Sequence, residues 1–272
     1  MAAHLALFVA LALGAATGCA KAPVVDRAMA LARTGKEDQA LVVLAAHLGK
    51  EPDDLAARRL FVRVLAITGD LKEARANVEE LRKRLPPDDP TPFLELGHAL
   101  ELAHRFDEAL EAYDDAARAA PSSPLGPRTA GLRAARWGES EVAEERLAEA
   151  VRRGATDAET FHALGLVRLH RRDLAGAEVA YRSALRADAN AVDSLIGLAS
   201  VALVREDFGA ALAAYDAVRA KRPRLAAAEL GRAYALLRLS RKLEAKDAID
   251  RAESLGGPPR NVTKLRELLS GP

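Results

Sequence analysis

Seven alanines recur at a nearly constant interval along this chain, and this periodicity constrains the fold more than any other feature. Their spacings are 34, 35, 34, 34, 34 and 34 residues, and they are Ala40, Ala74, Ala109, Ala143, Ala177, Ala211 and Ala245. A fixed period of this length indicates a repeat architecture in which each unit packs on its neighbours. Alanine is abundant, with 60 of 272 residues, so other positions have to follow the same period before the repeat is established.

Three further sets of residues follow the period. Four residues after the alanines stand larger apolar residues: Leu44, Val78, Tyr113, Leu147, Tyr181, Tyr215 and Ile249. Twelve residues before most of them stand mainly small residues: Ala28, Val62, Gly97, Gly131, Gly165 and Ala199. A spacing of four keeps side chains on one helical face, and small residues allow a second helix to approach. Prolines twelve residues after four of the alanines, Pro52, Pro86, Pro121 and Pro223, end the second helix. Each unit is therefore predicted to be a pair of helices.

Composition agrees with an all-helical protein and excludes several functional classes. Aromatic residues make up only 4% of the chain, whereas strands favour β-branched and aromatic residues. The formal net charge is +1, which argues against nucleic acid as the main partner. A single cysteine provides neither an intramolecular disulfide nor a thiolate metal cluster.

These columns resemble the tetratricopeptide repeat (TPR), whose pattern is W-x2-L-G-x2-Y, then A-x3-F, then P over 34 residues. The segment from Pro90 to Ser123 matches at Phe93, Leu96, Gly97, Leu100, Ala109, Tyr113, Ala116 and Pro121. The resemblance implies an all-α fold, a right-handed α-α superhelical solenoid of about seven units with a C-terminal capping helix.

The predicted units are the ranges 21–54, 55–88, 90–123, 124–157, 158–191, 192–225 and 226–259. In the seventh unit, Leu230 and Gly231 lie two residues early relative to Ala245, so we expect its first helix or turn to be distorted. Residues 260–272 form the capping helix and tail, because Val262, Leu265, Leu268 and Leu269 share one helical face.

The first 18 residues are predicted to be a signal peptide. The run from Ala2 to Gly18 contains no charged residue apart from His4 and is short for a membrane span. Cys19 follows it directly and resembles the lipidated cysteine of bacterial lipoproteins, although Ala16 stands where leucine is usual and the segment before the run lacks lysine and arginine. The resemblance implies that residues 19–20 begin a mature chain anchored through lipid on Cys19. Ala20 then favours the outer membrane, facing the periplasm. The alternatives are cleavage near Ala20 with release to the periplasm as a soluble protein, and no export.

No catalytic, metal or cofactor site is predicted, and no small-molecule substrate is expected. His162 and His170 are eight residues apart on one predicted helix, about 12 Å along its axis, which is too far to share a metal. No glycine-rich phosphate loop follows a strand. We therefore expect a protein that is not an enzyme.

The TPR resemblance also implies where a partner binds, because positions 2, 5, 9, 12 and 13 of the first helix face the concave wall in TPR proteins. Here these positions place a basic region before an apolar one. The candidate residues are Arg59, Arg63, His98, Arg128, Leu132, Arg136, His162, Leu166, Leu169, Ile196 and Leu203. A matching partner is an extended segment or amphipathic helix that carries carboxylates and apolar anchors. The alternative is that the arginines pair with acids on adjacent helices and the leucines belong to the core.

The expected function is a lipid-anchored scaffold that binds a protein or peptide partner in an envelope complex. Within this class the chain is similar to the TPR lipoproteins, called pilotins, that assist assembly of type IV pilus secretins. Two other classes remain open: a cytoplasmic or soluble TPR adaptor or regulator, and a peptide-recognition subunit of an enzyme.

Overall fold

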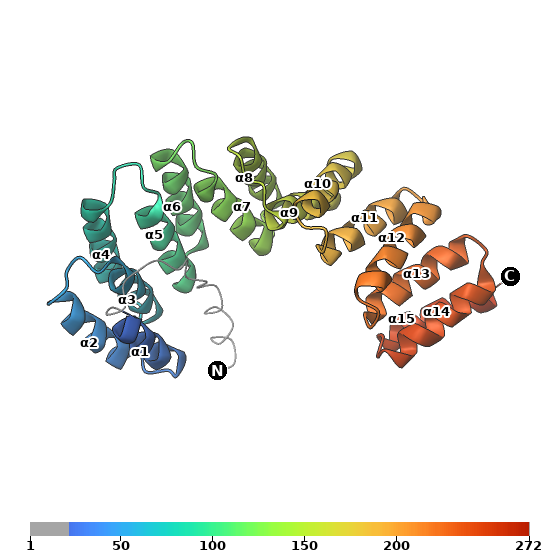
Figure 1. The fold of residues 1–272 in the computed structure, drawn as a ribbon, viewed down its shortest axis with the longest axis horizontal. Helices are drawn as coiled ribbons and strands as arrows, with labels where there is room; N and C mark the ends of the chain where they lie inside the picture. Colours follow the sequence, from blue (N-terminus) through green and yellow to red (C-terminus); the bar gives the residue numbers. More distant parts are fainter. Residues whose placement is uncertain (1–21, 272) are drawn as a thin grey trace. The chain divides into compact units, whose positions relative to one another are not determined.

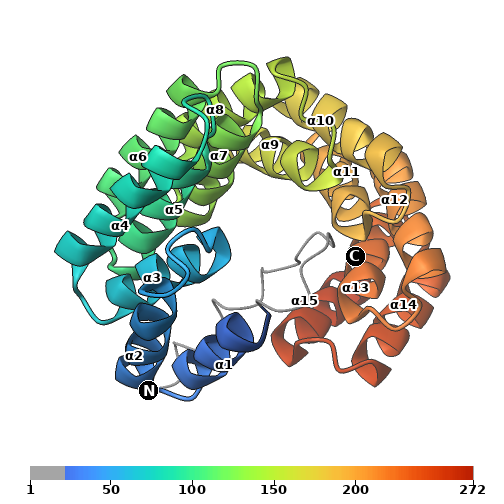
Figure 2. The ribbon, with the colours of Figure 1, turned by 60° about the vertical axis from the view of Figure 1, so that its left-hand side comes forward.

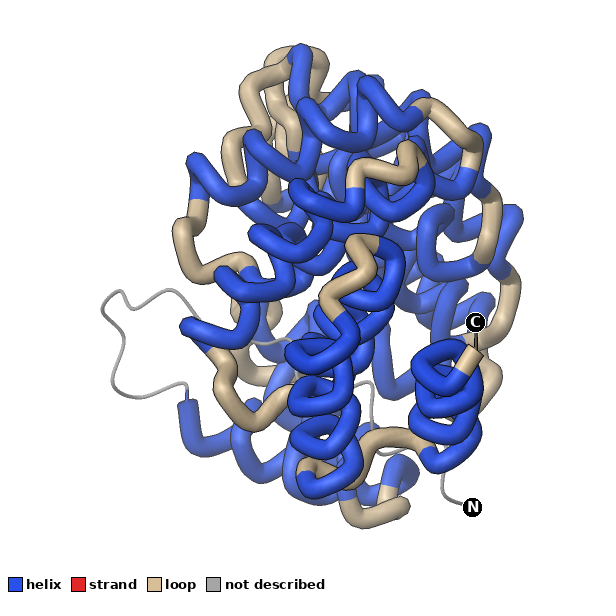
Figure 3. The backbone as a smooth tube through the Cα atoms, turned by 90° about the vertical axis from the view of Figure 1, so that its right-hand side faces the viewer, coloured by secondary structure: helices blue, strands red, loops and turns tan. Residues whose placement is uncertain are grey.

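The computed structural model describes residues 22–271, and every regular element in that range is a helix (Figures 1 and 3). The predicted signal segment and Cys19 lie outside the described residues. The helices are α1 (Ala22–Arg33), α2 (Glu37–Leu48), α3 (Leu55–Ile67), α4 (Leu71–Arg84), α5 (Thr91–Leu102), α6 (Phe106–Ala119), α7 (Leu125–Trp137), α8 (Ser140–Arg152), α9 (Ala158–His170), α10 (Leu174–Ala187), α11 (Val192–Val204), α12 (Phe208–Lys221), α13 (Ala226–Arg238), α14 (Lys242–Ser254) and α15 (Pro259–Ser270). The all-α fold predicted from the sequence is confirmed. None of these helices is both long and apolar enough to cross a membrane.

The described chain divides into two compact parts, residues 22–130 and residues 131–271, and the division falls within α7. In the N-terminal part, α1 to α6 each pack on the next helix along the chain. In the C-terminal part, the same holds from α8 to α15. Two helices lie within each of the seven predicted ranges. We call each range a repeat and number its positions from its first residue.

The periodic alanines mark the place where the two helices of a repeat cross. All seven stand at position 20, and none has any exposed surface. Position 24, one helical turn later, carries the larger apolar side chain that packs on the small residue at position 8 of the first helix. A Cβ atom built on Gly165 would lie only 2.7 Å from Cδ1 of Tyr181, and one built on Gly131 would lie 2.7 Å from Cγ of Leu147. In these two repeats the helices are therefore closer than any residue larger than glycine at position 8 allows.

The turn between the two helices has the same geometry in every repeat. Position 15 has a positive φ in all seven, at Gly35, Gly69, His104, Gly138, Arg172, Glu206 and Ser240. In the second repeat, the Gly69 amide donates to the Ala66 carbonyl at 3.2 Å, and the next amide, of Asp70, donates to the Leu65 carbonyl at 2.8 Å. This pair of bonds is the Schellman motif, which satisfies the last carbonyls of a helix. Four repeats adopt this turn with a residue other than glycine, so the helix packing imposes it.

The seventh repeat is regular, and the expected distortion is wrong. Its helices α13 and α14 have 13 residues each, and Ser240 occupies the left-handed turn position. Position 8 is Ala233, which is fully buried as its equivalents are. Gly231 stands at position 6, where its Cα faces the ring of Tyr215 in the preceding repeat, just as Gly197 faces Tyr181. The Leu-Gly pair of this repeat stands at positions 5 and 6, not at positions 7 and 8 as in the third repeat, and therefore does not mark the helix crossing.

Helix α15 packs on α13 and α14 through Val262 and Leu265, which are buried. It covers apolar surface of the seventh repeat that would otherwise be exposed. Its C-terminal end is held by Lys242, whose Nζ donates to the Gly271 carbonyl at 3.1 Å.

We predict that Gly69→Ala and Gly209→Ala have opposite effects on stability. Gly69 has φ +87° and open space around its Cα, so an added Cβ meets only backbone strain, which costs about 1 kcal/mol. Gly209 lies within α12, where alanine is favoured over glycine by up to about 1 kcal/mol. Urea denaturation followed by circular dichroism measures both. Stabilisation by Gly69→Ala would contradict the assigned turn.

Candidate functional site

Within each part, some first helices of neighbouring repeats lie against each other. In the N-terminal part α3 packs on α5, and in the C-terminal part α9 packs on α11. Figure 2 shows α3 and α5 on one side of the N-terminal part and the second helices α4 and α6 on the other. We call the surface at positions 2, 5, 9, 12 and 13 of the first helices the first-helix face.

In the N-terminal part, this face carries two arginines joined to one buried carboxylate. Glu95 of α5 is 1% exposed, and it accepts from Nε of Arg63 at 2.7 Å and from Nη2 of the same residue at 2.9 Å. The Nε atom of Arg59 also donates to Glu95 at 2.7 Å. A bidentate arginine contact of this kind fixes both side chains. The cluster of two guanidinium groups and one carboxylate has a net charge of +1.

The pKa of Glu95 is set by two opposing effects. Burial alone would raise the pKa of the Glu95 carboxyl, but the charge and hydrogen bonds of Arg63, together with the charges of Arg59 and His98, hold it below its ordinary value. Glu95 is therefore ionised at neutral pH. This pairing of Arg59 and Arg63 with an acid on the adjacent helix is the one that the alternative interpretation of the sequence expected.

The two arginines differ in side-chain exposure and in the number of N–H donors that Glu95 does not use. Arg63 has a side chain that is only 19% exposed and already binds both oxygens of Glu95. The side chain of Arg59 is 43% exposed. Because a guanidinium carries five donors, Arg59 still presents donors to solvent.

The remaining predicted residues on α5 and α7 range from half-buried to exposed. The ring of His98 is half-buried and meets the edge of Tyr113 at 5.6 Å between centroids. Arg128 and Leu132 of α7 are partly buried, and Arg136 near the end of the same helix is exposed.

In the C-terminal part, the face begins with a buried polar contact. Nδ1 of His162 lies 3.1 Å from Oγ of Ser194, which is fully buried on α11, and the His162 ring lies 5.7 Å from that of Tyr181. Burial lowers the pKa of His162, with Asp193 opposing the shift, so the imidazole is neutral at pH 7. His162 is thereby part of the contact between the fifth and sixth repeats.

The four predicted apolar residues of this part divide into one exposed residue and three that pack inward. Leu166 is 39% exposed. The other three are partly buried and pack on separate core clusters: Leu169 on the cluster with Tyr181, Ile196 on the cluster with Val218, and Leu203 on the cluster with Leu236. Leu166 is thus the most accessible apolar anchor of the four.

An aromatic group on α13 also lies on the first-helix face and was not predicted from the sequence. Tyr234 stands at position 9 of the seventh repeat, and its ring lies 6.4 Å from that of Phe208 in a T-shaped contact. The Arg238 guanidinium lies 4.3 Å from the centroid of the Phe208 ring and donates to the Tyr234 hydroxyl at 3.1 Å. Tyr234 is position 9 of the predicted range 226–259, so the sequence could have predicted it. The expected distortion of the first helix in that repeat left its positions unassigned.

Among residues 22–271, no three or more histidine, cysteine, aspartate and glutamate side chains come together in a group that could hold a metal ion.

Comparison with known families matches the tetratricopeptide repeat model to residues 61–124 and 196–258. The chain carries tetratricopeptide repeats. The two matched segments come from different parts of the chain and follow the same 34-residue period as the TPR helix pairs between them.

Solved structures of TPR proteins share this fold. YrrB, described as a TPR protein with an unusual peptide-binding site, has 17% identity and a TM-score of 0.63 over 70% of this chain and 97% of its own. The C-terminal part of a TPR protein from Cytophaga hutchinsonii has 15% identity and a TM-score of 0.67 over 88% of this chain and 98% of its own. PilW, described as a widely conserved type IV pilus biogenesis factor, has 15% identity and a TM-score of 0.57 over 76% and 98%. No curated protein matches the sequence. At such low sequence identities, the structural similarity establishes a common fold and nothing about function.

We predict that Glu95→Gln destabilises the protein by about 3 kcal/mol at pH 7, because it leaves two arginines beside a buried neutral group. The folded pKa of Glu95 lies below its unfolded value of about 4.3, so the ionised carboxylate stabilises the fold above that pH and this stabilisation is lost as the pH falls through the folded pKa. The difference between the wild type and Glu95→Gln, measured by urea denaturation, should therefore be largest near neutral pH and shrink below about pH 4.

Glu108→Gln serves as the control, because Glu108 forms an exposed pair with Arg75. Its cost should stay under about 1 kcal/mol. An equal cost for both variants at pH 7, or a Glu95→Gln cost that does not change between pH 7 and pH 3, would contradict the assigned role of Glu95.

Proposed function

We propose that this chain is a non-enzymatic scaffold whose first-helix face binds a segment of a partner protein. The observation that carries the proposal is the state of Arg59. Its guanidinium is anchored to a buried carboxylate yet keeps unused donors at the surface. An arginine held in this way loses little side-chain freedom when it binds a carboxylate, which favours recognition.

The chemistry of the partner follows from the two parts separately. The N-terminal part offers the +1 cluster around Arg59, which suits an aspartate, a glutamate or a terminal carboxylate. The C-terminal part offers Leu166, an exposed apolar side chain beside half-buried neighbours, which suits an aliphatic or aromatic anchor. TPR helix pairs leave such faces open along several repeats, which supports an extended segment or a helix as the ligand.

The proposal places the protein in the bacterial envelope, anchored through lipid on Cys19 in the outer membrane and facing the periplasm. Its support is the sequence from Ala2 to Cys19, an uncharged run apart from His4 that ends in Gly-Cys. Within that setting we propose a role in assembling an envelope complex. A pilus or secretion complex is the specific case, consistent with the fold that the chain shares with PilW.

We predict that Arg59→Ala and Leu166→Ser weaken partner binding in different ways. The partner is first captured by crosslinking from membranes, and its affinity for purified variants is then measured by surface plasmon resonance. Arg59→Ala should mainly slow association and reduce its salt dependence, whereas Leu166→Ser should mainly speed dissociation, by about tenfold for a loss of about 1.4 kcal/mol.

Two matched controls lie on second helices. Arg75→Ala removes an arginine of similar exposure on α4, and Val179→Ser removes a side chain that is 61% exposed on α10. Both should leave the affinity unchanged. If the controls weaken binding while Arg59→Ala and Leu166→Ser do not, the partner binds the opposite face.

We predict that labelled palmitate enters the protein when it is expressed in a bacterium, and that Cys19→Ala abolishes the label. Several acyl chains hold a protein on a membrane, whereas one chain binds only marginally, so the wild type should require detergent for extraction. Cys19→Ala should appear in an unprocessed or soluble form. Equal labelling of both proteins would refute the lipid anchor, and an unlabelled wild type in the periplasm would favour soluble export.

A further inference from the structure

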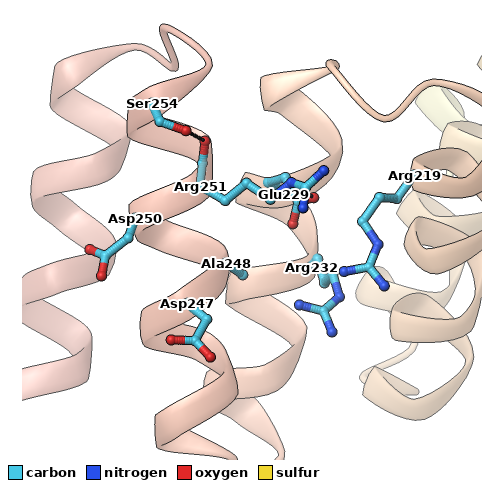
Figure 4. Close-up of a pocket in the computed structure, with 8 residues that line it drawn as sticks. All are labelled: Arg219, Glu229, Arg232, Asp247, Ala248, Asp250, Arg251 and Ser254. Atoms are coloured by element: carbon cyan, nitrogen blue, oxygen red, sulfur yellow. Dashed lines mark hydrogen bonds and ion pairs between the residues drawn. The ribbon is translucent and has the colours of Figure 1, made fainter.

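A pocket of about 410 Å³ lies between α12, α13 and α14 of the C-terminal part (Figure 4). Most of its lining is charged: Arg219, Glu229, Arg232, Asp247, Ala248, Asp250, Arg251 and Ser254. Its residues on α13 stand at positions 4 and 7 of the seventh repeat, which are not positions of the first-helix face. The pocket is thus separate from the proposed partner site.

The pocket occurs where the TPR pattern normally places apolar side chains. Position 4 is Phe93 in the third repeat and Phe161 in the fifth, whereas it is Glu229 in the seventh. Position 7 is likewise leucine in the third and fifth repeats and Arg232 in the seventh. A glutamate is smaller than an aromatic residue, so this exchange leaves space and places a carboxylate at its inner end.

Glu229 is 1% exposed, and neither of its carboxylate oxygens accepts a hydrogen bond within the described residues. Its one ionic contact is with Nε of Arg251, 3.0 Å from Oε1, and this contact does not form a hydrogen bond. A buried carboxylate without donors is costly. It therefore has the capacity to accept bonds from a ligand.

The second repeat has a buried charge at the same position that makes two side-chain hydrogen bonds, although its Nε atom makes none. Position 4 there is Arg58, which is also buried. Its Nη1 donates to Oδ1 of Asn77 at 2.8 Å, and its Nη2 donates to the Pro52 carbonyl at 2.8 Å. Glu229 has no such partners, so its lack of hydrogen bonds is not a general property of the position.

The cations of the pocket already have acids beside them. Nε of Arg232 donates to Oδ1 of Asp216 at 2.7 Å, and Arg219 lies 3.7 Å from the same oxygen. Asp250 pairs with Arg266 of α15 at 2.9 Å. Asp247, by contrast, is exposed, and its side chain makes no hydrogen bond or ion pair within residues 22–271. The pocket therefore has unused hydrogen-bond acceptors, the carboxylates of Glu229 and Asp247, and its arginines are already paired with acids.

We propose that this pocket binds a primary ammonium group, such as that of a lysine side chain, with Glu229 as the main acceptor. An ammonium group has three donors and no acceptor, which matches a carboxylate that has none of its bonds made. Arg251 extends from α14 to Glu229, as Figure 4 shows, and its side chain is half-exposed. It covers the carboxylate in the free protein and swings outward when the ammonium group enters.

The test is an NMR titration of the full-length protein with n-butylammonium chloride at constant ionic strength. Saturable shifts of the Arg251 and Arg232 Nε–H signals are expected. Glu229→Gln keeps the side-chain volume and should weaken binding by about tenfold or more. Arg251→Ala removes the competing cation and should strengthen binding, so the two variants should change the affinity in opposite directions.

Glu244→Gln is the matched control, because Glu244 is an exposed acid on α14 that pairs with Arg241. It should leave the affinity unchanged, and circular dichroism verifies that each variant is folded. Glu229→Leu provides a second readout: it restores the apolar residue type of position 4, and it should raise the melting temperature while abolishing binding. Binding that is unchanged in Glu229→Gln would overturn the proposal. Saturable binding of inorganic phosphate without binding of the amine would also overturn it, since that result would assign the pocket to anions.

The same titration distinguishes two sources of the ammonium group. Nα-acetyl-lysine N-methylamide represents a lysine within a partner chain, and putrescine represents a free diamine. Tighter binding of the lysine amide would identify a peptide ligand, and tighter binding of putrescine a free polyamine. Failure of all three amines to bind would refute the ammonium site and leave the first-helix face untouched.

Discussion

The close crossing of the two helices in each repeat is the contact on which the rest of the structure depends. It requires a small residue at position 8, alanine at position 20 and a larger apolar side chain at position 24. At Gly165 the ring of Tyr181 occupies the space that a Cβ atom would need. Close-packed interiors tolerate little change in volume, so this contact fixes how far apart the helices stand. The distance in turn decides which positions remain open on the first-helix face.

The same crossing imposes the turn between the helices. Once the two axes are fixed, the chain has to reverse within three residues, and a left-handed residue at position 15 achieves this. Glycine adopts that conformation freely, but His104, Arg172, Glu206 and Ser240 adopt it as well. Their backbone strain is outweighed by the packing of the helices on either side. The preference of most residues for negative φ at position 15 is thus outweighed by the helix-packing contacts of the whole repeat.

Two buried glutamates show how the repeat handles charge. Glu95 of α5 pairs with both Arg59 and Arg63 of the adjacent first helix, α3. These hydrogen bonds offset the free-energy cost of burying the carboxylate. Glu229 is equally buried, but its neighbouring arginine makes an ionic contact without a hydrogen bond. The first glutamate therefore holds Arg59 in place while part of the Arg59 side chain stays exposed. The carboxylate of the second glutamate makes no hydrogen bond, and the proposed ammonium site is based on that observation.

The sequence by itself determined the number of helix pairs and the identity of the buried positions, because a period of 34 residues fixes which side chains face the crossing. The positions of the first-helix face came from the resemblance to TPR proteins, and Tyr234 was not predicted because the Leu-Gly pair in the seventh repeat suggested a shifted register. Only the tertiary structure decided how those positions are used. Arg59 and Arg63 are 36 and 32 residues from Glu95 in the chain, and their pairing depends on the packing of α3 on α5. Leu169, Ile196 and Leu203 have the same residue types as exposed anchors would have, and their burial depends on neighbouring repeats. Periodicity records which face a residue occupies, whereas exposure and pairing depend on what the next repeat places opposite that face.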